Sequence, residues 1–196
     1  MQKFERMLPG KYYHVYNRGI NKENIFSEHV DYRKFLNLYE KFIDPIADTF
    51  AWCLMPNHFH FLIKIFDPDR VQYPVEKITD PSRAFSHLFN AYAQSFNKRS
   101  ERIGGLFMTP FQRKPVDDVA YFRQLVFYIH NNPVKHGFCD SMMDYPWSSY
   151  GTLVSVRENL QQGLPFVGWF DNKADFIRFH AENHHAEEIK AVIFEE

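Results

Sequence analysis

Residues 50–66 read Phe50-Ala-Trp-Cys-Leu-Met-Pro-Asn-His-Phe-His-Phe-Leu-Ile-Lys-Ile-Phe66, and this stretch decides the fold. Its apolar and aromatic residues are typical of two strands, Phe50 to Met55 and His58 to Phe66. Between them, Pro56-Asn57 provides a tight link. The stretch therefore predicts two neighbouring antiparallel strands.

The sequence on either side of these strands supplies further strands and helices. A strand over Lys11 to Asn17 comes first and is followed by a loop, after which apolar residues recur at helical spacing up to about Ile43, with Ser27 as the expected cap. After the hairpin we expect a loop over 67–79 and a helix that begins with Asp80-Pro81. Beyond the Gly104-Gly105 break, we expect a strand over Leu106 to Val116. A helix should then begin at Asp117 or Asp118 and stop before Pro133.

This order of elements predicts the fold class. Strand, helix, strand, strand, helix, strand is the ferredoxin-like split βαβ order, an α+β architecture. Such a domain has an antiparallel sheet with helices on one face, and we expect the other face to be free for a site or a partner. With 196 residues, of which 45% are hydrophobic, the chain is long enough for one well-formed core.

The chain divides near Tyr150. Residues 1–150 carry all the motifs discussed below and are expected to form the main domain, which closes with an aromatic turn over Tyr145 to Tyr150. Residues 151–196 form an extension with one expected short helix, from Asn172 to about Glu182. The sequence reveals no role for this extension.

Cysteine content and hydropathy indicate the compartment. Cys53 and Cys139 form neither a disulfide framework nor a metal-type spacing. Residues 1–10 lack the apolar core of a signal peptide, and no apolar run approaches the length of a membrane span. We therefore expect a cytoplasmic protein with no membrane partner.

Charge is distributed unevenly along the chain. The net charge is −1, so overall electrostatics do not predict a nucleic-acid partner. Between residues 83 and 115, however, Glu101 is the single acidic residue. The basic residues of this segment are Arg83, Lys98, Arg99, Arg102, Arg113 and Lys114. This cluster is either a solvated face or a patch for phosphates.

Two histidines occupy alternate positions on the expected third strand. Successive side chains of a strand point to opposite faces, so His58 and His60 point to the same side and Phe59 to the other. Two neutral imidazoles suit Mn, Zn, Co or Ni, and serve Mg if oxygen ligands complete the shell. The alternative is a pair of surface or hydrogen-bonded histidines.

A tyrosine and an asparagine lie four residues apart on the helix that precedes Pro133. Tyr128 and Asn132 therefore share one helix face. One interpretation is a core aromatic and a helix cap; the other is an oxygen nucleophile and a third metal ligand. Tyr121, seven residues earlier, is a rival nucleophile, and His130 and His136 are candidate general bases.

Taken together, these motifs resemble the HUH-class single-tyrosine transposases, and in particular their REP-associated branch. Met55 to His60 matches the metal motif of that class, and Tyr128 to Val134 its nucleophile helix. Three further matches are Tyr13 to Gly19, Gln112 to Lys114 and Trp147 to Tyr150. The resemblance covers roughly 70% of the chain, from about Tyr12 to Tyr150.

The resemblance implies a function as well as a ferredoxin-like fold. Tyr128 would attack a phosphate of single-stranded DNA and form a 5′-phosphotyrosine, so that rejoining needs no ATP. His58, His60 and Asn132 would hold one Mg²⁺ or Mn²⁺. The partner would be a single-stranded DNA hairpin at the end of a mobile element, and the protein would be a monomer or a homodimer.

We therefore predict a metal-dependent single-strand DNA transposase with seven candidate DNA contacts. They come from the first loop and the basic cluster: Asn17, Arg18, Arg83, Lys98, Arg99, Arg113 and Lys114. One alternative is a catalytically silent module that binds DNA hairpins on the same fold. Another is a metal-dependent hydrolase with no covalent step.

Overall fold

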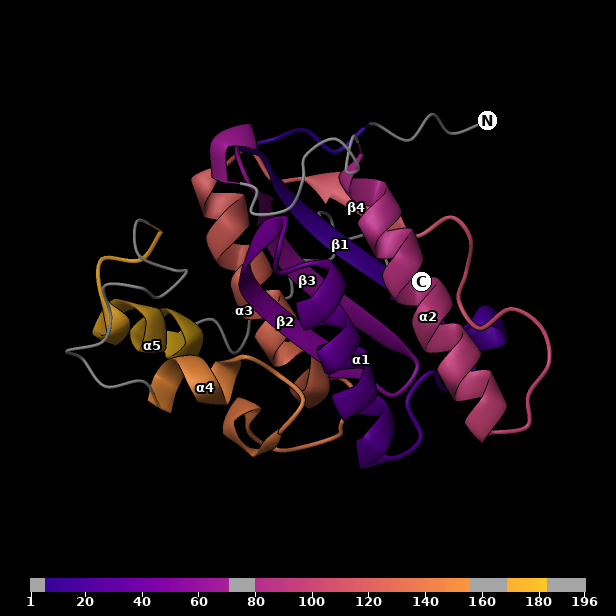
Figure 1. Cartoon of the computed structure of the whole chain (residues 1–196). Helices are drawn as coiled ribbons and strands as arrows, with labels where there is room; N and C mark the ends of the chain where they lie inside the picture. Colours follow the sequence, from indigo (N-terminus) through magenta and orange to yellow (C-terminus); the bar gives the residue numbers. More distant parts are fainter. Residues whose placement is uncertain (1–5, 71–79, 156–168, 183–196) are drawn as a thin grey trace.

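The computed structural model describes residues 6–70, 80–155 and 169–182, and its centre is a four-stranded sheet. The strands are β1 (Tyr12–Arg18), β2 (Ala47–Met55), β3 (His58–Ile65) and β4 (Gln112–Pro115), in the order β2-β3-β1-β4 (Figure 1). Every neighbouring pair is antiparallel. β1 and β2 consequently run parallel with β3 inserted between them, which is the split βαβ arrangement and confirms the predicted fold class.

β2 and β3 form the hairpin that the opening stretch predicts. Met55 pairs with His58, so Pro56 and Asn57 alone join the two strands. β2 begins at Ala47, ahead of the predicted Phe50, and its register with β3 shifts between Thr49 and Ala51. Such a bulge twists the strand locally, which suits β2 because it is an outer strand of the sheet.

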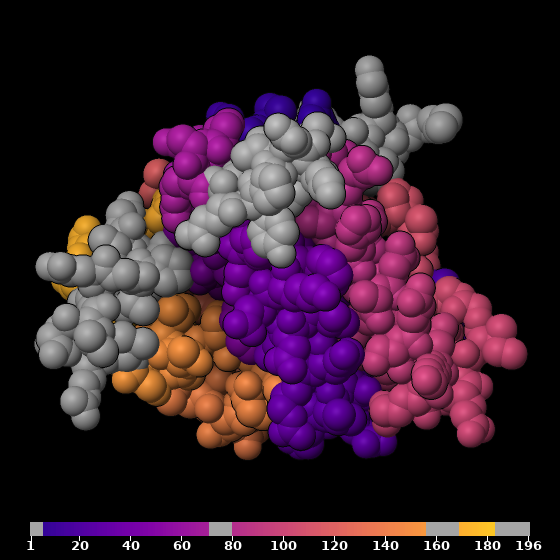
Figure 2. Space-filling view, in the orientation of Figure 1, coloured from indigo at the N-terminus to yellow at the C-terminus, as the bar shows by residue number. Residues whose placement is uncertain are grey.

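Helices α1 (His29–Phe42) and α2 (Pro81–Arg99) cover one face of the sheet, and they lie side by side in the space-filling view (Figure 2). Their apolar faces pack against alternate residues of the strands, among them Val15, Phe59 and Phe61, which are at most 1% exposed. Asp80 caps α2 as predicted, because its side chain accepts a hydrogen bond from the Ser82 amide.

The predicted cap of α1 is wrong. Glu28 is the N-cap and forms a reciprocal capping box with Asp31. The Asp31 carboxylate also accepts a hydrogen bond from the backbone amide of Ser27 at 2.9 Å. Ser27 therefore takes part in the cap through its backbone amide. One carboxylate can accept hydrogen bonds from several amides at once, so Asp31 serves both Ser27 and Glu28.

Helix α3 (Val119–Lys135) packs on the opposite face of the sheet, so the expectation that this face would be free is wrong. Phe122, Leu125 and Ile129 are fully buried there in a second core with residues of β2. The helix also passes through Pro133, where the sequence predicted its end. Proline has a helical φ, so it removes one intrahelical hydrogen bond while the His136 amide still bonds the Asn132 carbonyl.

The fourth strand is much shorter than predicted. The segment from Leu106 forms one bridge, between Phe107 and Gly19, before β4 begins at Gln112. The Asn17 side chain donates a hydrogen bond to the Met108 carbonyl at 3.0 Å, and the Met108 amide bonds the Arg18 carbonyl. These bonds hold the segment beside the end of β1 without a regular ladder.

The remaining elements are short. Single 3₁₀ turns lie at Ile20–Lys22, Pro68–Arg70 and Met142–Asp144, and the chain continues with α4 (Tyr150–Ser155) and α5 (Lys173–Glu182). The aromatic turn packs on the main domain as expected, since the Trp147 ring stacks on Tyr32 at 4.5 Å. None of the helices within residues 6–70, 80–155 and 169–182 is long and apolar enough to cross a membrane.

Candidate metal and nucleophile site

The register of β1 and β3 places four side chains together on the α3 side of the sheet. His58 lies opposite Arg18, and His60 lies opposite Tyr16. Directly opposed residues of an antiparallel pair share a face and have neighbouring Cβ atoms. The two histidines therefore share a face, as the strand pattern predicts, and Arg18 is next to His58.

Asn132 reaches His58 from α3. The Asn132 Oδ1 atom lies 3.2 Å from His58 Nε2, and Asn57 Oδ1 lies 2.7 Å from His58 Nδ1. Both ring nitrogens of His58 thus face an amide oxygen. A neutral His58 that donates through Nδ1 to Asn57 directs its Nε2 lone pair toward Asn132 Oδ1, and a metal ion bound by both atoms would satisfy this arrangement.

His60 is held by His14 on the neighbouring strand. The His60 Nδ1 atom lies 2.9 Å from His14 Nε2, and both side chains are fully buried. Burial lowers the pKa of both imidazoles well below the usual value, with a further contribution to the His60 pKa from His58. A neutral His60 that donates through Nδ1 to His14 would direct Nε2 toward a metal, the usual arrangement of a histidine ligand.

A metal ion fits beside His58 and His60 only if the side-chain amide of Asn132 is one of its ligands. Within the described ranges, no three side chains of His, Cys, Asp or Glu are grouped so that they could hold a metal ion. Two ligands at about 2.1 Å from one ion, roughly at right angles, are about 3 Å apart, close to the 3.2 Å between His58 Nε2 and Asn132 Oδ1. The buried Asn132 Nδ2 atom has no hydrogen-bond partner among the described residues. The distance between His58 and Asn132 is therefore compatible with one shared ion, and the full set of His58, His60 and Asn132 stays a prediction.

Tyr128 lies one helical turn before Asn132 on the same face. Its ring centre is 5.4 Å from that of His60 and 6.5 Å from that of His14, in edge-to-face orientations. The ammonium of Lys135 lies 5.5 Å from the centre of the Tyr128 ring. The structure thus brings the predicted nucleophile, the two histidines and a cation together.

Tyr121, the rival nucleophile, lies farther toward the start of α3. The ammonium of Lys114 is 5.6 Å from the centre of its ring. Burial, with a smaller contribution from Tyr16, raises the Tyr121 pKa to about 12. This makes the phenolate scarcer than that of an ordinary tyrosine, and Tyr121 lies two helical turns from Tyr128, toward the end of α3 remote from Asn132.

The two candidate general bases differ in position. The His136 ring lies 5.5 Å from the His58 ring, at the edge of the site. His130 is fully buried on the other side of α3, where it contacts His180 and Ser149. His130 is therefore wrongly placed to act on Tyr128, because a two-residue step turns the helix by about 200°.

The predicted DNA contacts fall on different surfaces. Lys114 pairs with His14 and faces α3, whereas Arg113 pairs with Val15 and faces α2. Asn17 is 5% exposed, and its amide group bonds the backbone at Arg18 and Met108. Asn17 therefore has a structural role. Of the seven, Arg18 and Lys114 lie on the face of the sheet that carries the site, opposite His58 and His14.

The three predicted contacts on α2 lie on the other side of the sheet. Arg83 and Lys98 are exposed there. Arg99 forms ion pairs with Glu28 at 2.9 Å and with the buried Asp31 at 2.6 Å. These pairs give Arg99 a structural role that the sequence did not predict.

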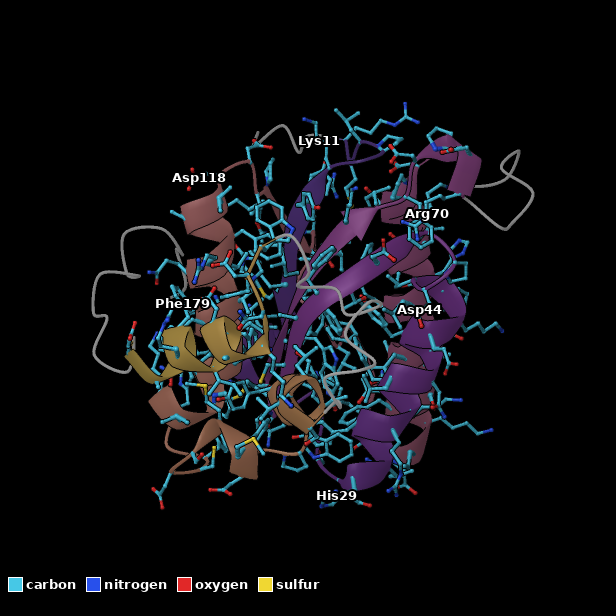
Figure 3. The ribbon with its side chains drawn as sticks, turned by 90° about the vertical axis from the view of Figure 1, so that its left-hand side faces the viewer. Lys11, His29, Asp44, Arg70, Asp118 and Phe179 are labelled. Carbon is cyan, nitrogen blue, oxygen red and sulfur yellow. The ribbon has the colours of Figure 1, made fainter. Side chains whose placement is uncertain are left out.

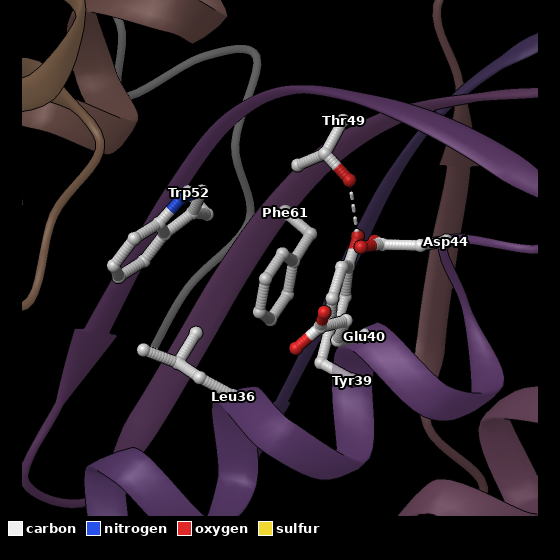
Figure 4. A pocket seen from close by; sticks show the side chains of 7 residues that line it. All are labelled: Leu36, Tyr39, Glu40, Asp44, Thr49, Trp52 and Phe61. Atoms are coloured by element: carbon white, nitrogen blue, oxygen red, sulfur yellow. Dashed lines mark hydrogen bonds between the residues drawn. The ribbon is translucent and has the colours of Figure 1, made fainter.

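A surface hollow of about 300 Å³ lies away from this site, between α1 and the outer strand β2 (Figure 4). It is lined by Leu36, Tyr39, Glu40, Asp44, Thr49, Trp52 and Phe61. The carboxylates of Glu40 and Asp44 both line this hollow. Burial, together with the nearby Glu40 carboxylate, raises the pKa of Asp44. Negative charge does not suit a phosphate, so this hollow is not a DNA site.

Sequence reasoning missed two residues of the site. His14 contacts His60, and Asn57 contacts His58. The alternation of Tyr12, His14 and Tyr16 along β1 could have indicated that His14 shares a face with its neighbours. Its contact with His60, however, depends on strand pairing.

The chain is similar in sequence to REP-associated tyrosine transposases, although no family model matches it. A Haemophilus influenzae protein described as a candidate REP-associated tyrosine transposase is 29% identical over 105 residues, 53% of this chain and 58% of that protein. The Escherichia coli K12 REP-associated tyrosine transposase is 21% identical over 126 residues, 64% of each chain. The chain therefore spans less than two thirds of the length of these curated relatives.

The fold is also similar to a solved structure. That structure is of a REP-associated tyrosine transposase bound to a REP hairpin, and it matches with a TM-score of 0.60 and 18% identity over 84% of this chain and 88% of that chain. At such identity the match shows a shared fold. With the sequence relatives, it confirms the resemblance that the motifs indicate.

Proposed function

We propose that this protein is a single-strand DNA transposase that cleaves and rejoins DNA beside hairpins through a 5′-phosphotyrosine. The proposal depends on one arrangement: the face of α3 that carries Tyr128 and Asn132 meets the strand that carries His58 and His60. The similarity to REP-associated tyrosine transposases, one of which is solved with a REP hairpin, supports DNA hairpins as the substrate.

In the proposed reaction, the Tyr128 hydroxyl oxygen forms a bond to a phosphorus of the DNA backbone. The bond from that phosphorus to the 3′-oxygen of the preceding nucleotide breaks, the tyrosine loses its proton, and the leaving oxygen takes one up. The part of the strand downstream of the cut remains joined to Tyr128 through its 5′-phosphate, and the upstream part leaves with a free 3′-hydroxyl. Attack by another 3′-hydroxyl reverses the step and joins two strands.

Cationic side chains around Tyr128 would assist this reaction. Arg18 lies opposite His58, and Lys135 lies over the Tyr128 ring, so both can contact a phosphate bound between them. A divalent ion such as Mg²⁺ or Mn²⁺, held by His58, His60 and Asn132, would polarise the phosphoryl oxygens. His14 and Asn57 would hold the two imidazoles in the required orientation.

A denaturing gel with matched tyrosine variants tests the proposal. Single-stranded hairpins from the DNA flanking the gene, labelled at the 5′ or the 3′ end, are incubated with the protein in Mn²⁺ or in EDTA. We expect a protein–DNA adduct that requires Mn²⁺, is lost in Tyr128→Phe and persists in Tyr121→Phe, which removes the neighbouring hydroxyl on the same helix face.

Other outcomes identify the alternatives. An adduct that survives in Tyr128→Phe contradicts the assignment of the nucleophile. Hairpin binding without any adduct supports the silent hairpin-binding module. Metal-dependent cleavage that leaves no adduct, and is unaffected by Tyr128→Phe, supports a hydrolase.

A further inference from the structure

A continuous chain of hydrogen bonds lies on the side of α3 that carries His130, opposite the side that carries Tyr128 and Asn132. The His180 Nδ1 atom of α5 lies 2.8 Å from the Phe176 carbonyl, and its Nε2 atom lies 3.0 Å from His130 Nδ1. His130 Nε2 lies 2.8 Å from the Ser149 hydroxyl, which also contacts the backbone of Trp52. The chain therefore links α5, α3 and β2.

The direction of each hydrogen bond follows from the groups at the two ends. A carbonyl only accepts, so His180 must donate through Nδ1 and accept through Nε2. His130 must then donate through Nδ1 and accept through Nε2. The Ser149 hydroxyl has two acceptors within reach, His130 Nε2 at 2.8 Å and the Trp52 carbonyl at 3.3 Å, and its oxygen accepts the Trp52 amide at 2.9 Å. With the proton on the shorter contact, every member of the chain is satisfied, and the chain favours one arrangement of the three elements.

His130 stands between the two functional residues of α3. Tyr128 precedes it by two positions and Asn132 follows it by two, and each such step turns the helix by about 200°. Both residues therefore point to the sheet while His130 points to α5. A rotation or shift of the helix that changes the His130 contacts must also move Tyr128 and Asn132 relative to His58.

The segment around α5 contacts α3 between Phe122 and His130, and in Figure 3 the helix that carries Phe179 crosses in front of α3. The Trp169 ring stacks on Phe122 at 3.9 Å, with an angle of 8° between the planes. Arg123 forms an ion pair with Asp175 at 3.1 Å and lies 4.6 Å from the centre of the Phe179 ring. The contacts thus extend from the first turns of α3 to His130.

We propose that α5 is a positioning element for the nucleophile helix, and that His180 acts through His130 to set the placement of Tyr128 and Asn132 against the His58 strand. This inference rests on the proposed function, because it concerns the same site. It assigns a role to residues 169–182, which belong to the extension for which the sequence indicated none. His180 is a positioning residue, since it acts through its contact with His130, which lies on the other side of α3 from Tyr128.

Three variants of α5 in the full-length chain separate positioning from stability. His180→Leu removes both hydrogen bonds of His180. His180→Gln retains one donor and one acceptor in the side-chain amide. Glu182→Gln is the matched control, because it removes an exposed contact with Arg178 at 4.0 Å on the same helix.

Each variant is measured well below its melting temperature for hairpin Kd, Mn²⁺ Kd and the rate of adduct formation. For His180→Leu we expect an Mn²⁺ Kd that is higher, and an adduct rate that is lower, by roughly 10-fold to 100-fold. We expect its hairpin Kd to be unchanged, His180→Gln to recover most of both losses, and Glu182→Gln to match the wild type.

A fourth readout does not depend on activity or on the metal. In ¹⁵N-labelled protein, the side-chain amide signals of Asn132 should shift in His180→Leu and return toward their wild-type positions in His180→Gln. Unchanged Asn132 signals in His180→Leu overturn the positioning role, even if the wild type forms no adduct. A hairpin Kd that rises by the same factor as the rate falls also overturns it, because it indicates a general loss of folded protein.

Discussion

Substitution of Asp31 tests the unexpected arrangement of Arg99. The Asp31 carboxylate is 3% exposed and accepts hydrogen bonds from the amides of Ser27 and Glu28, at 2.9 and 3.0 Å. Its third partner is the Arg99 guanidinium at 2.6 Å. Asp31→Ala removes all three interactions at the start of α1.

The expected cost follows from these contacts. Each amide that loses its acceptor at the helix start costs about 1 kcal/mol. The side chain of Arg99 is 34% exposed and retains Glu28, so the lost ion pair adds about 1 kcal/mol at most. We therefore expect Asp31→Ala to lower the free energy of unfolding by about 3 kcal/mol. For a chain of this length, that corresponds to a fall in Tm of roughly 6–12 °C.

Urea unfolding and thermal melts of Asp31→Ala, Arg99→Ala and the double variant measure this cost. We expect Arg99→Ala to cost about 1 kcal/mol, and the double variant to cost less than the sum because the two residues interact. A loss of less than about 1 kcal/mol for Asp31→Ala would refute the reasoning. A flatter salt dependence of hairpin binding in Arg99→Ala would show instead that Arg99 contacts phosphate.

Two further predictions concern pH and DNA. Burial lowers the pKa of His14, His60 and His130, so only the unfolded chain takes up these protons as the pH falls below about 6.5. Each of the three groups should then lower the free energy of unfolding by up to about 1.4 kcal/mol per pH unit. Equal urea midpoints at pH 7.5 and 5.5 would contradict this prediction. Lys114→Ala should reduce the slope of log affinity against log salt by about one unit. Arg113→Ala, its neighbour on the opposite face, should leave that slope unchanged, and equal effects of the two would contradict a DNA surface on the α3 side.

The local pattern of the sequence determined the elements and their order. The two apolar runs joined by Pro56-Asn57 predicted the hairpin, and the two-residue period of a strand placed His58 and His60 on one face. The four-residue spacing placed Tyr128 and Asn132 on one helix face. These predictions depend on periods of two and 3.6 residues, which tertiary contacts do not alter. Only the resemblance to a known family predicted that the histidine pair and the Tyr128–Asn132 pair belong to one site.

Tertiary structure alone decided which of these side chains meet. His58 and Asn132 are 74 residues apart, and their 3.2 Å contact exists because α3 folds back across the sheet. The same packing closed the face that we expected to be free and brought His14 to His60. No local spacing encodes such distances, because they depend on strand register and on how a helix lies against a sheet.

Tertiary structure also reassigned residues that the sequence could describe only by type. Arg99 belongs to a basic cluster in the sequence, yet the fold places it against the acidic start of α1. Asn17 follows a strand pattern, yet its amide bonds the backbone beside Met108. His180 lies in a segment without a recognisable motif, 50 residues from His130, and only the fold joins them. The sequence shows which charged groups and hydrogen-bond donors a chain carries. Residues from distant segments determine which partner each of these groups contacts in the folded protein.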